Sequence, residues 1–100
     1  MSMMNRNECI GLIQSKSDVL KNEYGIISLR LFGSVSRNEQ NGTSDVDVFV
    51  ETQTPNPFIL IAAKDYLTQL VGCPVDIIRS HRNLNPRLKK RIERDGVTVF

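Results

Sequence analysis

Three segments of the chain carry apolar residues at the spacing of an α-helix. They span residues 5–23, 58–71 and 86–94, and in each the apolar positions form one stripe along the predicted helix. Each segment is also bounded by residues that commonly start or end a helix. These are Gly25 after the first, Asn56-Pro57 and Gly72 around the second, and Asn85-Pro86 and Asp95-Gly96 around the third.

Four shorter segments are rich in β-branched and large apolar residues and predict β-strands. They span residues 26–32, 45–51, 75–78 and 97–100. The order of elements is then α-β-β-α-β-α-β. This order predicts a small α/β or α+β fold, with one mixed β-sheet and helices packed mainly on one of its faces.

The second predicted strand contains two carboxylates that a fully buried strand would not tolerate. Side chains alternate across a strand, so its three valines share one face while Asp45 and Asp47 project from the other. Asp76 repeats the arrangement in the third strand, where its apolar neighbours point away from it. If the third strand lies beside the second, all three aspartates share one face of the sheet. This adjacency of the two strands is a hypothesis.

Three carboxylates on one apolar sheet predict a site for a divalent cation. Like charges repel strongly where water is partly excluded, and a bound cation removes that repulsion. Oxygen donors without a nearby His or Cys favour Mg²⁺ over zinc. Mg²⁺ held by few carboxylates commonly takes phosphates as its other ligands, and a pair of such ions stabilises in-line displacement at phosphorus.

A candidate phosphate-binding turn lies between the first and second strands. Gly33 permits close approach of a ligand to the backbone, and free N–H groups after Ser34 favour an anion. Arg37 adds a cation, so a nucleoside triphosphate fits between this turn and the aspartates. Alone, an Asp-x-Asp pair or a Gly-Ser turn is a weak signal, because both are common at strand ends. Their order, together with a third aspartate, favours a functional site.

Length and composition predict one domain over residues 1–100. The chain is 40% hydrophobic with a net charge of +2, and it has neither an apolar run long enough to span a membrane nor a recognisable signal peptide. A cytoplasmic location is therefore expected. Cys9 and Cys73 lack further ligands at zinc spacing, and we expect both to be reduced, buried and small.

The positive charge is concentrated near the C-terminus, where seven of the 13 Lys and Arg residues lie between Arg79 and Arg94. In the last predicted helix, an inward apolar face contrasts with a basic face. The inward residues are Leu84, Leu88 and Ile92, and the basic ones are Arg87, Lys90, Arg91 and Arg94. The simplest interpretation is a solvated basic face. The functional alternative is a docking stripe for an acidic partner. Direct binding of nucleic acid is not expected.

Two further side chains are candidates for a role in the site. Phe49 shares the aspartate face of the second strand, where it either lines a nucleotide-base pocket or packs into the core, the commoner fate of Phe. His81 is the single histidine and follows the third strand. We expect it to be a loop residue and not a catalytic base.

The segments LFGSVSR, SDVDVFV and PVDII together resemble the DNA polymerase β-like nucleotidyltransferase superfamily. They are most similar to the minimal nucleotidyltransferases (MNT), the antitoxins of HEPN–MNT toxin–antitoxin pairs. The resemblance covers residues 26–100 and implies the polymerase β-like fold. One departure is Asn38, where the family usually has Gly after the arginine.

The resemblance implies a role for each candidate residue. Gly33, Ser34 and Arg37 would bind the nucleotide phosphates, and Asp45, Asp47 and Asp76 would hold Mg²⁺ and support catalysis. The implied reaction transfers AMP from ATP to a hydroxyl, expected to be a tyrosine, of a cognate HEPN RNase toxin. A non-catalytic antitoxin that covers the toxin sterically is one alternative. A nucleotidyltransferase for small molecules is a weaker one.

Overall fold

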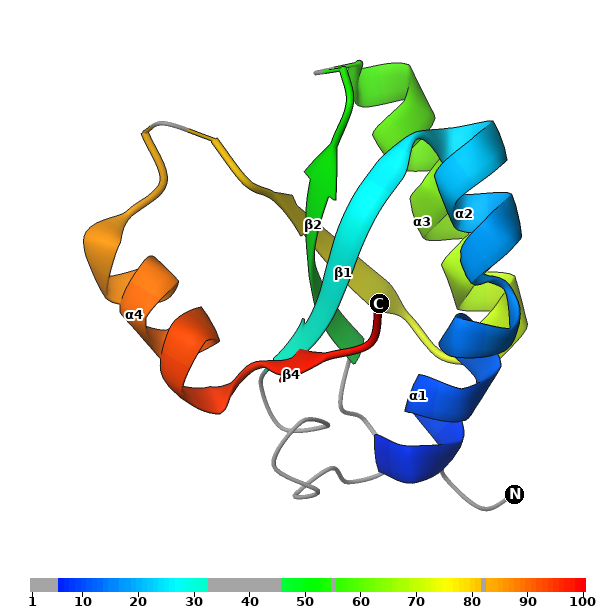
Figure 1. The fold of residues 1–100 in the computed structure, drawn as a ribbon, viewed down its shortest axis with the longest axis horizontal. Helices are drawn as coiled ribbons and strands as arrows, with labels where there is room; N and C mark the ends of the chain where they lie inside the picture. Colours follow the sequence, from blue (N-terminus) through cyan, green and yellow to red (C-terminus); the bar gives the residue numbers. More distant parts are fainter. Residues whose placement is uncertain (1–5, 33–45, 55, 82) are drawn as a thin grey trace.

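The computed structural model describes residues 6–32, 46–54, 56–81 and 83–100, which build one mixed β-sheet with helices on both faces (Figure 1). The strand order is β3-β2-β1-β4; β1 is antiparallel to β2 and β4, and β3 is parallel to β2. The elements are α1 (Arg6–Ser15), α2 (Ser17–Tyr24), β1 (Ile26–Phe32), β2 (Val46–Thr52), α3 (Pro57–Val71), β3 (Val75–Arg79), α4 (Pro86–Asp95) and β4 (Val97–Thr98).

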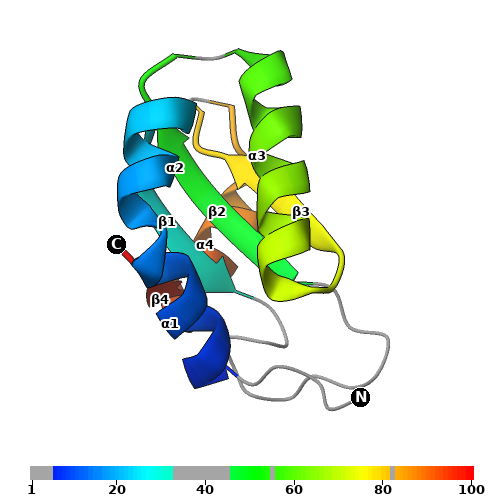
Figure 2. The same cartoon turned by 90° about the vertical axis from the view of Figure 1, so that its right-hand side faces the viewer.

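The helices divide unequally between the two faces of the sheet. Figures 1 and 2 show α1, α2 and α3 side by side on one face and α4 by itself on the other. We call these the covered face and the open face. The predicted fold class, a mixed sheet with helices mainly on one face, is confirmed.

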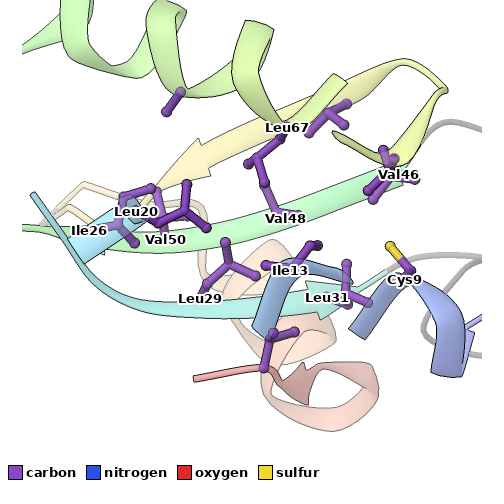
Figure 3. Close-up of a cluster of buried hydrophobic side chains, with 14 residues drawn as sticks. Cys9, Ile13, Leu20, Ile26, Leu29, Leu31, Val46, Val48, Val50 and Leu67 are labelled. Atoms are coloured by element: carbon purple, nitrogen blue, oxygen red, sulfur yellow. The ribbon is translucent and has the colours of Figure 1, made fainter. Parts of the chain in front are cut away.

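The hydrophobic core lies between the covered face and the three helices on it (Figure 3). Val48 and Val50 of β2 have no exposed surface, and neither have Leu29 and Leu31 of β1. The intervening residues of β2 remain partly exposed, as the alternation along a strand requires. The amphipathic pattern of each strand therefore decides which face the helices cover.

The predicted N-terminal helix over residues 5–23 is wrong in one respect, because the chain forms two helices that meet at Lys16. Lys16 leaves helical geometry (φ −113°, ψ 18°), and its N–H donates to the carbonyl of Ile13 in a tighter turn. The Ser15 hydroxyl donates to the carbonyl of Leu12 at 2.6 Å, a side-chain bond of the kind that competes with helical pairing. The break leaves both Ile13 and Leu20 fully buried.

The predicted boundaries of the other helices are confirmed. The Asn56 side chain accepts a hydrogen bond from the Phe58 N–H at 2.9 Å, and Asn85 does the same for Arg87. These are N-caps, with proline at the first helical position in both helices. At the other end of α3, Gly72 adopts φ 76°, a left-handed conformation that residues with a Cβ atom rarely adopt.

The last predicted strand, residues 97–100, is shorter in the structure, where β4 covers Val97–Thr98. Its pairing with β1 nevertheless continues: the Val99 N–H donates to Leu29, and the Leu29 N–H donates to Phe100. In the part of the chain that the structure describes, no helix is long and apolar enough to cross a membrane.

Candidate active site

Asp47 and Asp76 lie side by side on the open face of the sheet. Strands β2 and β3 pair in parallel register, with Asp47 opposite Asp76. Neighbouring strands are about 4.8 Å apart, and residues in register project to the same side. Asp47 is half-buried and Asp76 is exposed. The predicted adjacency of the second and third strands is therefore confirmed, and it brings together two carboxylates that are far apart in the sequence.

The local sequence explains why both carboxylates face away from the core. Val46 and Val48 flank Asp47, and Val75 and Ile77 flank Asp76. All four apolar neighbours belong to the core or pack against it. The start of β2 is also held against the segment before β3, because the Val46 N–H donates to the Pro74 carbonyl at 2.9 Å. Burial of the valines thus orients the two aspartates.

The predicted phosphate-binding turn and the third aspartate lie outside the described residues. They are Gly33, Ser34, Arg37 and Asp45. The described residues on either side of this segment are nevertheless informative. Phe32, the last residue of β1, pairs with Asp47 near the start of β2. The chain therefore leaves β1 and enters β2 at the end of these strands where the carboxylate pair lies.

The donor chemistry of the pair suits a hard divalent cation. Two adjacent carboxylates repel each other, and their oxygen atoms are ligands that Mg²⁺ prefers. Soft donors do not lie on these strands, since β2 and β3 contain neither His nor Cys. Among the described residues, no group of three His, Cys, Asp or Glu side chains forms a metal site. The two described carboxylates are therefore only part of the three-aspartate set that the sequence predicts.

The next row of side chains on the open face is apolar and basic. Phe49 of β2 is in register with Ile78 of β3 and with Arg30 of β1. Phe49 is half-buried on the carboxylate face. It therefore does not pack within the covered core, although core packing is the commoner fate of Phe. Arg30 alternates along β1 with the buried Leu29 and Leu31, so it projects from the outward face. Its Nε donates to the Thr98 hydroxyl of β4 at 3.4 Å.

His81 lies in the loop after β3, as predicted. It is exposed, and its Nδ1 accepts a hydrogen bond from the Asn83 N–H at 3.2 Å. This bond closes a short turn before Asn85. The role of His81 in the structure is therefore that of a loop residue.

Both cysteines are free thiols in the structure, as expected. Cys9 is fully buried in the core as predicted, whereas Cys73, which was also predicted to be buried, is only half-buried against the core. Burial, with a smaller contribution from the neighbouring Cys73, raises the pKa of Cys9 to about 11. A thiol with this pKa stays protonated at neutral pH and behaves as an apolar core side chain.

The chain belongs to the nucleotidyltransferase domain family, whose model matches residues 13–99. It is therefore a nucleotidyltransferase, with the mixed sheet and the carboxylate pair described above. A presumed protein adenylyltransferase of Methanocaldococcus jannaschii is 36% identical over 94 residues, which are 93% of this chain and 96% of that relative.

Solved structures share the fold over nearly the whole chain. A presumed minimal nucleotidyltransferase superposes with a TM-score of 0.77 at 31% identity, covering 97% of this chain and 98% of the other. A toxin–antitoxin structure with AMP-PNP gives a TM-score of 0.69 at 22% identity, over 97% and 73% of the two chains. The complex of tri-AMPylated Shewanella oneidensis HEPN toxin with MNT antitoxin gives 0.64 at 19% identity, over 91% and 71%.

Proposed function

We propose that this chain transfers AMP from ATP to a tyrosine hydroxyl of a cognate HEPN-family toxin and thereby acts as its antitoxin. The observation that carries the proposal is the parallel register of Asp47 and Asp76 on the open face of the sheet. The similarity to presumed protein adenylyltransferases supports AMP as the transferred group and a protein as the acceptor. The fold shared with an AMPylated HEPN–MNT complex supports the class of partner, and a neighbour with AMP-PNP supports ATP as the donor.

The proposed roles of the residues follow from their positions in the chain. Asp45, Asp47 and Asp76 hold Mg²⁺, and Gly33, Ser34 and Arg37 bind the phosphates of ATP. When bound, Mg²⁺ neutralises charge on the phosphates and on the attacking oxygen. The acceptor oxygen forms a bond to the α-phosphorus while the bond from that phosphorus to the bridging oxygen breaks. Asp76 takes the hydroxyl proton, and pyrophosphate leaves with the electron pair of the broken bond.

Most of the rate enhancement comes from positioning and charge neutralisation, because the reacting groups themselves are on ATP and on the acceptor. Asp76 is exposed on β3, an edge strand of the sheet, and this position allows contact with an incoming hydroxyl. Asp47, which is half-buried between β1 and β3, is better placed to hold the metal. We propose a cytoplasmic location, where ATP and an RNase toxin are both present.

Intact-mass measurement of a candidate HEPN-family toxin, ideally the product of a neighbouring gene, tests the proposal. After incubation with ATP and Mg²⁺, we expect a gain of about 329 Da for each AMP added, with pyrophosphate as the leaving group. Asp47→Asn and Asp76→Asn should remove the gain. Glu51→Gln is the matched control, because Glu51 is an exposed acid at the far end of β2 and its substitution should leave the gain unchanged.

Binding measurements separate the roles of the two aspartates. Asp76→Asn should abolish transfer while retaining more ATP binding than Asp47→Asn does, and equal loss of both activities would contradict the role assigned to Asp76. A stable complex without any mass gain would favour the non-catalytic antitoxin. Transfer to a small hydroxylated molecule but to no protein would favour the small-molecule enzyme.

A further inference from the structure

Helix α4 lies on the same face of the sheet as the carboxylate pair. The other three helices lie across the sheet from it (Figures 1 and 2). Ile92 is 1% exposed and Leu88 is half-buried, so this side of α4 is turned inward as the sequence predicts. A protein that binds to α4 is therefore on the carboxylate side of the sheet. One that binds to α1, α2 or α3 is on the opposite side.

The outward surface of α4 carries a basic stripe, which we define as Arg87, Lys90, Arg91 and Arg94. All four residues are exposed, and at 100° per residue they fall within an arc of about 100° around the helix. The acid Glu93 and the cation Lys89 lie on the other flank. Within the described residues the structure gives the stripe one salt bridge, from Arg94 to Asp95 at 3.2 Å, and the Arg94 side chain remains 74% exposed.

A fifth cation lies next to the end of α4. Arg30 is on the open face and donates from Nε to Thr98 of β4, and β4 begins two residues after α4 ends. The net charge of the chain is only +2, so this concentration of cations is local and not a property of the whole surface. Local potentials of one sign steer oppositely charged partners and orient them on encounter.

We propose that the basic stripe docks an acidic surface of the protein that receives AMP, and so presents the acceptor hydroxyl to the carboxylate face. This inference rests on the proposed function for the identity of the partner. Protein is favoured over RNA because single-stranded RNA is held by aromatic stacking as well as by charge. Among the described residues, the exposed large apolar side chains are Ile27, Phe58 and Ile61, and none of them is on α4.

A pair of neighbouring lysines provides a matched test. Lys89 and Lys90 are both exposed on α4 but project from different flanks of the helix. Lys90→Glu should weaken binding of the candidate HEPN-family toxin, whereas Lys89→Glu makes the same charge change and should leave the dissociation constant within about twofold, as expected for charges outside an interface. Equal effects of the two variants would overturn the proposal, because only net charge would then matter.

A double variant enlarges the effect and keeps a control. Lys90→Glu combined with Arg91→Glu should raise the dissociation constant about tenfold or more and flatten its dependence on salt, as for reversed charges at an interface. Lys16→Glu combined with Lys64→Glu changes the net charge equally, and both of these lysines are exposed on elements away from α4. Unchanged affinity in a Lys90/Arg91 variant with wild-type circular dichroism and melting temperature would contradict docking at the stripe.

Three readouts distinguish this inference from the proposed function. AMP transfer at saturating partner concentration should survive the double reversal, because the carboxylate pair is untouched. If wild-type protein binds the partner through the stripe but transfers no AMP, the proposed function fails and the docking inference stands. If a radiolabelled single-stranded RNA binds wild-type protein and loses binding in the double variant, while affinity for the HEPN protein is unchanged, the docking inference is overturned.

Discussion

Neighbouring side chains along β2 meet opposite environments on the two faces of the sheet. Val48 is fully buried beneath the helices of the covered face, while Asp47 is half-buried beside Asp76 on the open face. The covered face supplies most of the hydrophobic contribution to stability, which scales with the apolar area removed from water. The open face carries the two aspartates, half-buried Asp47 and exposed Asp76, in adjacent strands. The comparison shows that alternation along a strand can place the residues that stabilise the fold on one face and the candidate site residues on the other.

Removal of a side chain from the covered face should have the largest effect on stability. Leu31 has no exposed surface, so Leu31→Ala should lower the free energy of unfolding by roughly 2–5 kcal/mol through lost burial and a residual cavity. Urea denaturation followed by circular dichroism measures this change. The adjacent Arg30→Ala is the control from the open face, with an expected change of at most about 1 kcal/mol. Equal losses would mean that the two faces do not differ as described.

The connection that holds α4 to the sheet is the next sensitive point. The Gly96 N–H donates to the carbonyl of Ile92 at 2.7 Å, and a Cβ at position 96 would collide with that same carbonyl oxygen. Gly96→Ala should therefore cost roughly 1–3 kcal/mol, as overpacked sites do. In α1, nothing lies within 4 Å of a Cβ added at Gly11. Gly11→Ala should accordingly stabilise the protein, and a loss there would contradict the explanation by local crowding.

The pH dependence of the free energy of unfolding reports how well Cys9 on the covered face is shielded from water. Its pKa is raised from 9.0 to about 11 by burial and by Cys73, so the folded state holds the thiol proton more tightly than the unfolded chain. The resulting stabilisation is fully present below pH 9 and is lost as pH rises towards 11. Denaturation at pH 8 and pH 10.5 should show wild type losing stability relative to Cys9→Ala. A constant difference between the two proteins would show that Cys9 is not shielded.

The smallest expected change in stability is at the carboxylate pair. Asp47→Asn keeps the size of the side chain while removing one of two adjacent negative charges, and it should alter the free energy of unfolding by about 0.5 kcal/mol, the lower end of the range for single substitutions. AMP transfer should nevertheless fall by about 10² or more, as for lost electrostatic stabilisation in active sites. A melting curve and the intact-mass assay on the same preparation make the comparison. A large loss of stability would assign Asp47 a structural role instead.

Much of the fold was predictable because its determinants are local. The boundaries of α3 and α4 follow from Asn caps, prolines at the first helical position and the residues after each helix. The strand over residues 26–32 follows from its apolar composition. The missed break at Lys16 has a different origin, since the apolar spacing continues through it. Packing of Ile13 and Leu20 into one core accompanies the break, and spacing alone does not reveal such a change of helix direction.

The candidate site was predictable to a smaller extent. The face on which Asp47 and Asp76 project follows from alternation with apolar neighbours, and the structure confirms that they lie together. Gly33, Ser34, Arg37 and Asp45 lie outside the described residues, so their roles remain predictions, as does the assignment of residues 1–100 to one domain. Arg30 does not stand out in the sequence, because a lone arginine on an outward strand face has no distinguishing pattern.

The sequence by itself determined which residues form helices and strands and which side of each strand is apolar, because periodicity and capping act over a few residues. It also determined that α4 has an apolar and a basic side. Only the tertiary structure decided that β3 pairs with β2 in the register that places Asp76 beside Asp47. Only the tertiary structure placed α4 on that same face. Both outcomes depend on contacts between segments distant in the chain. Each helix and strand is locally compatible with several arrangements, and burial of the whole core selects one of them.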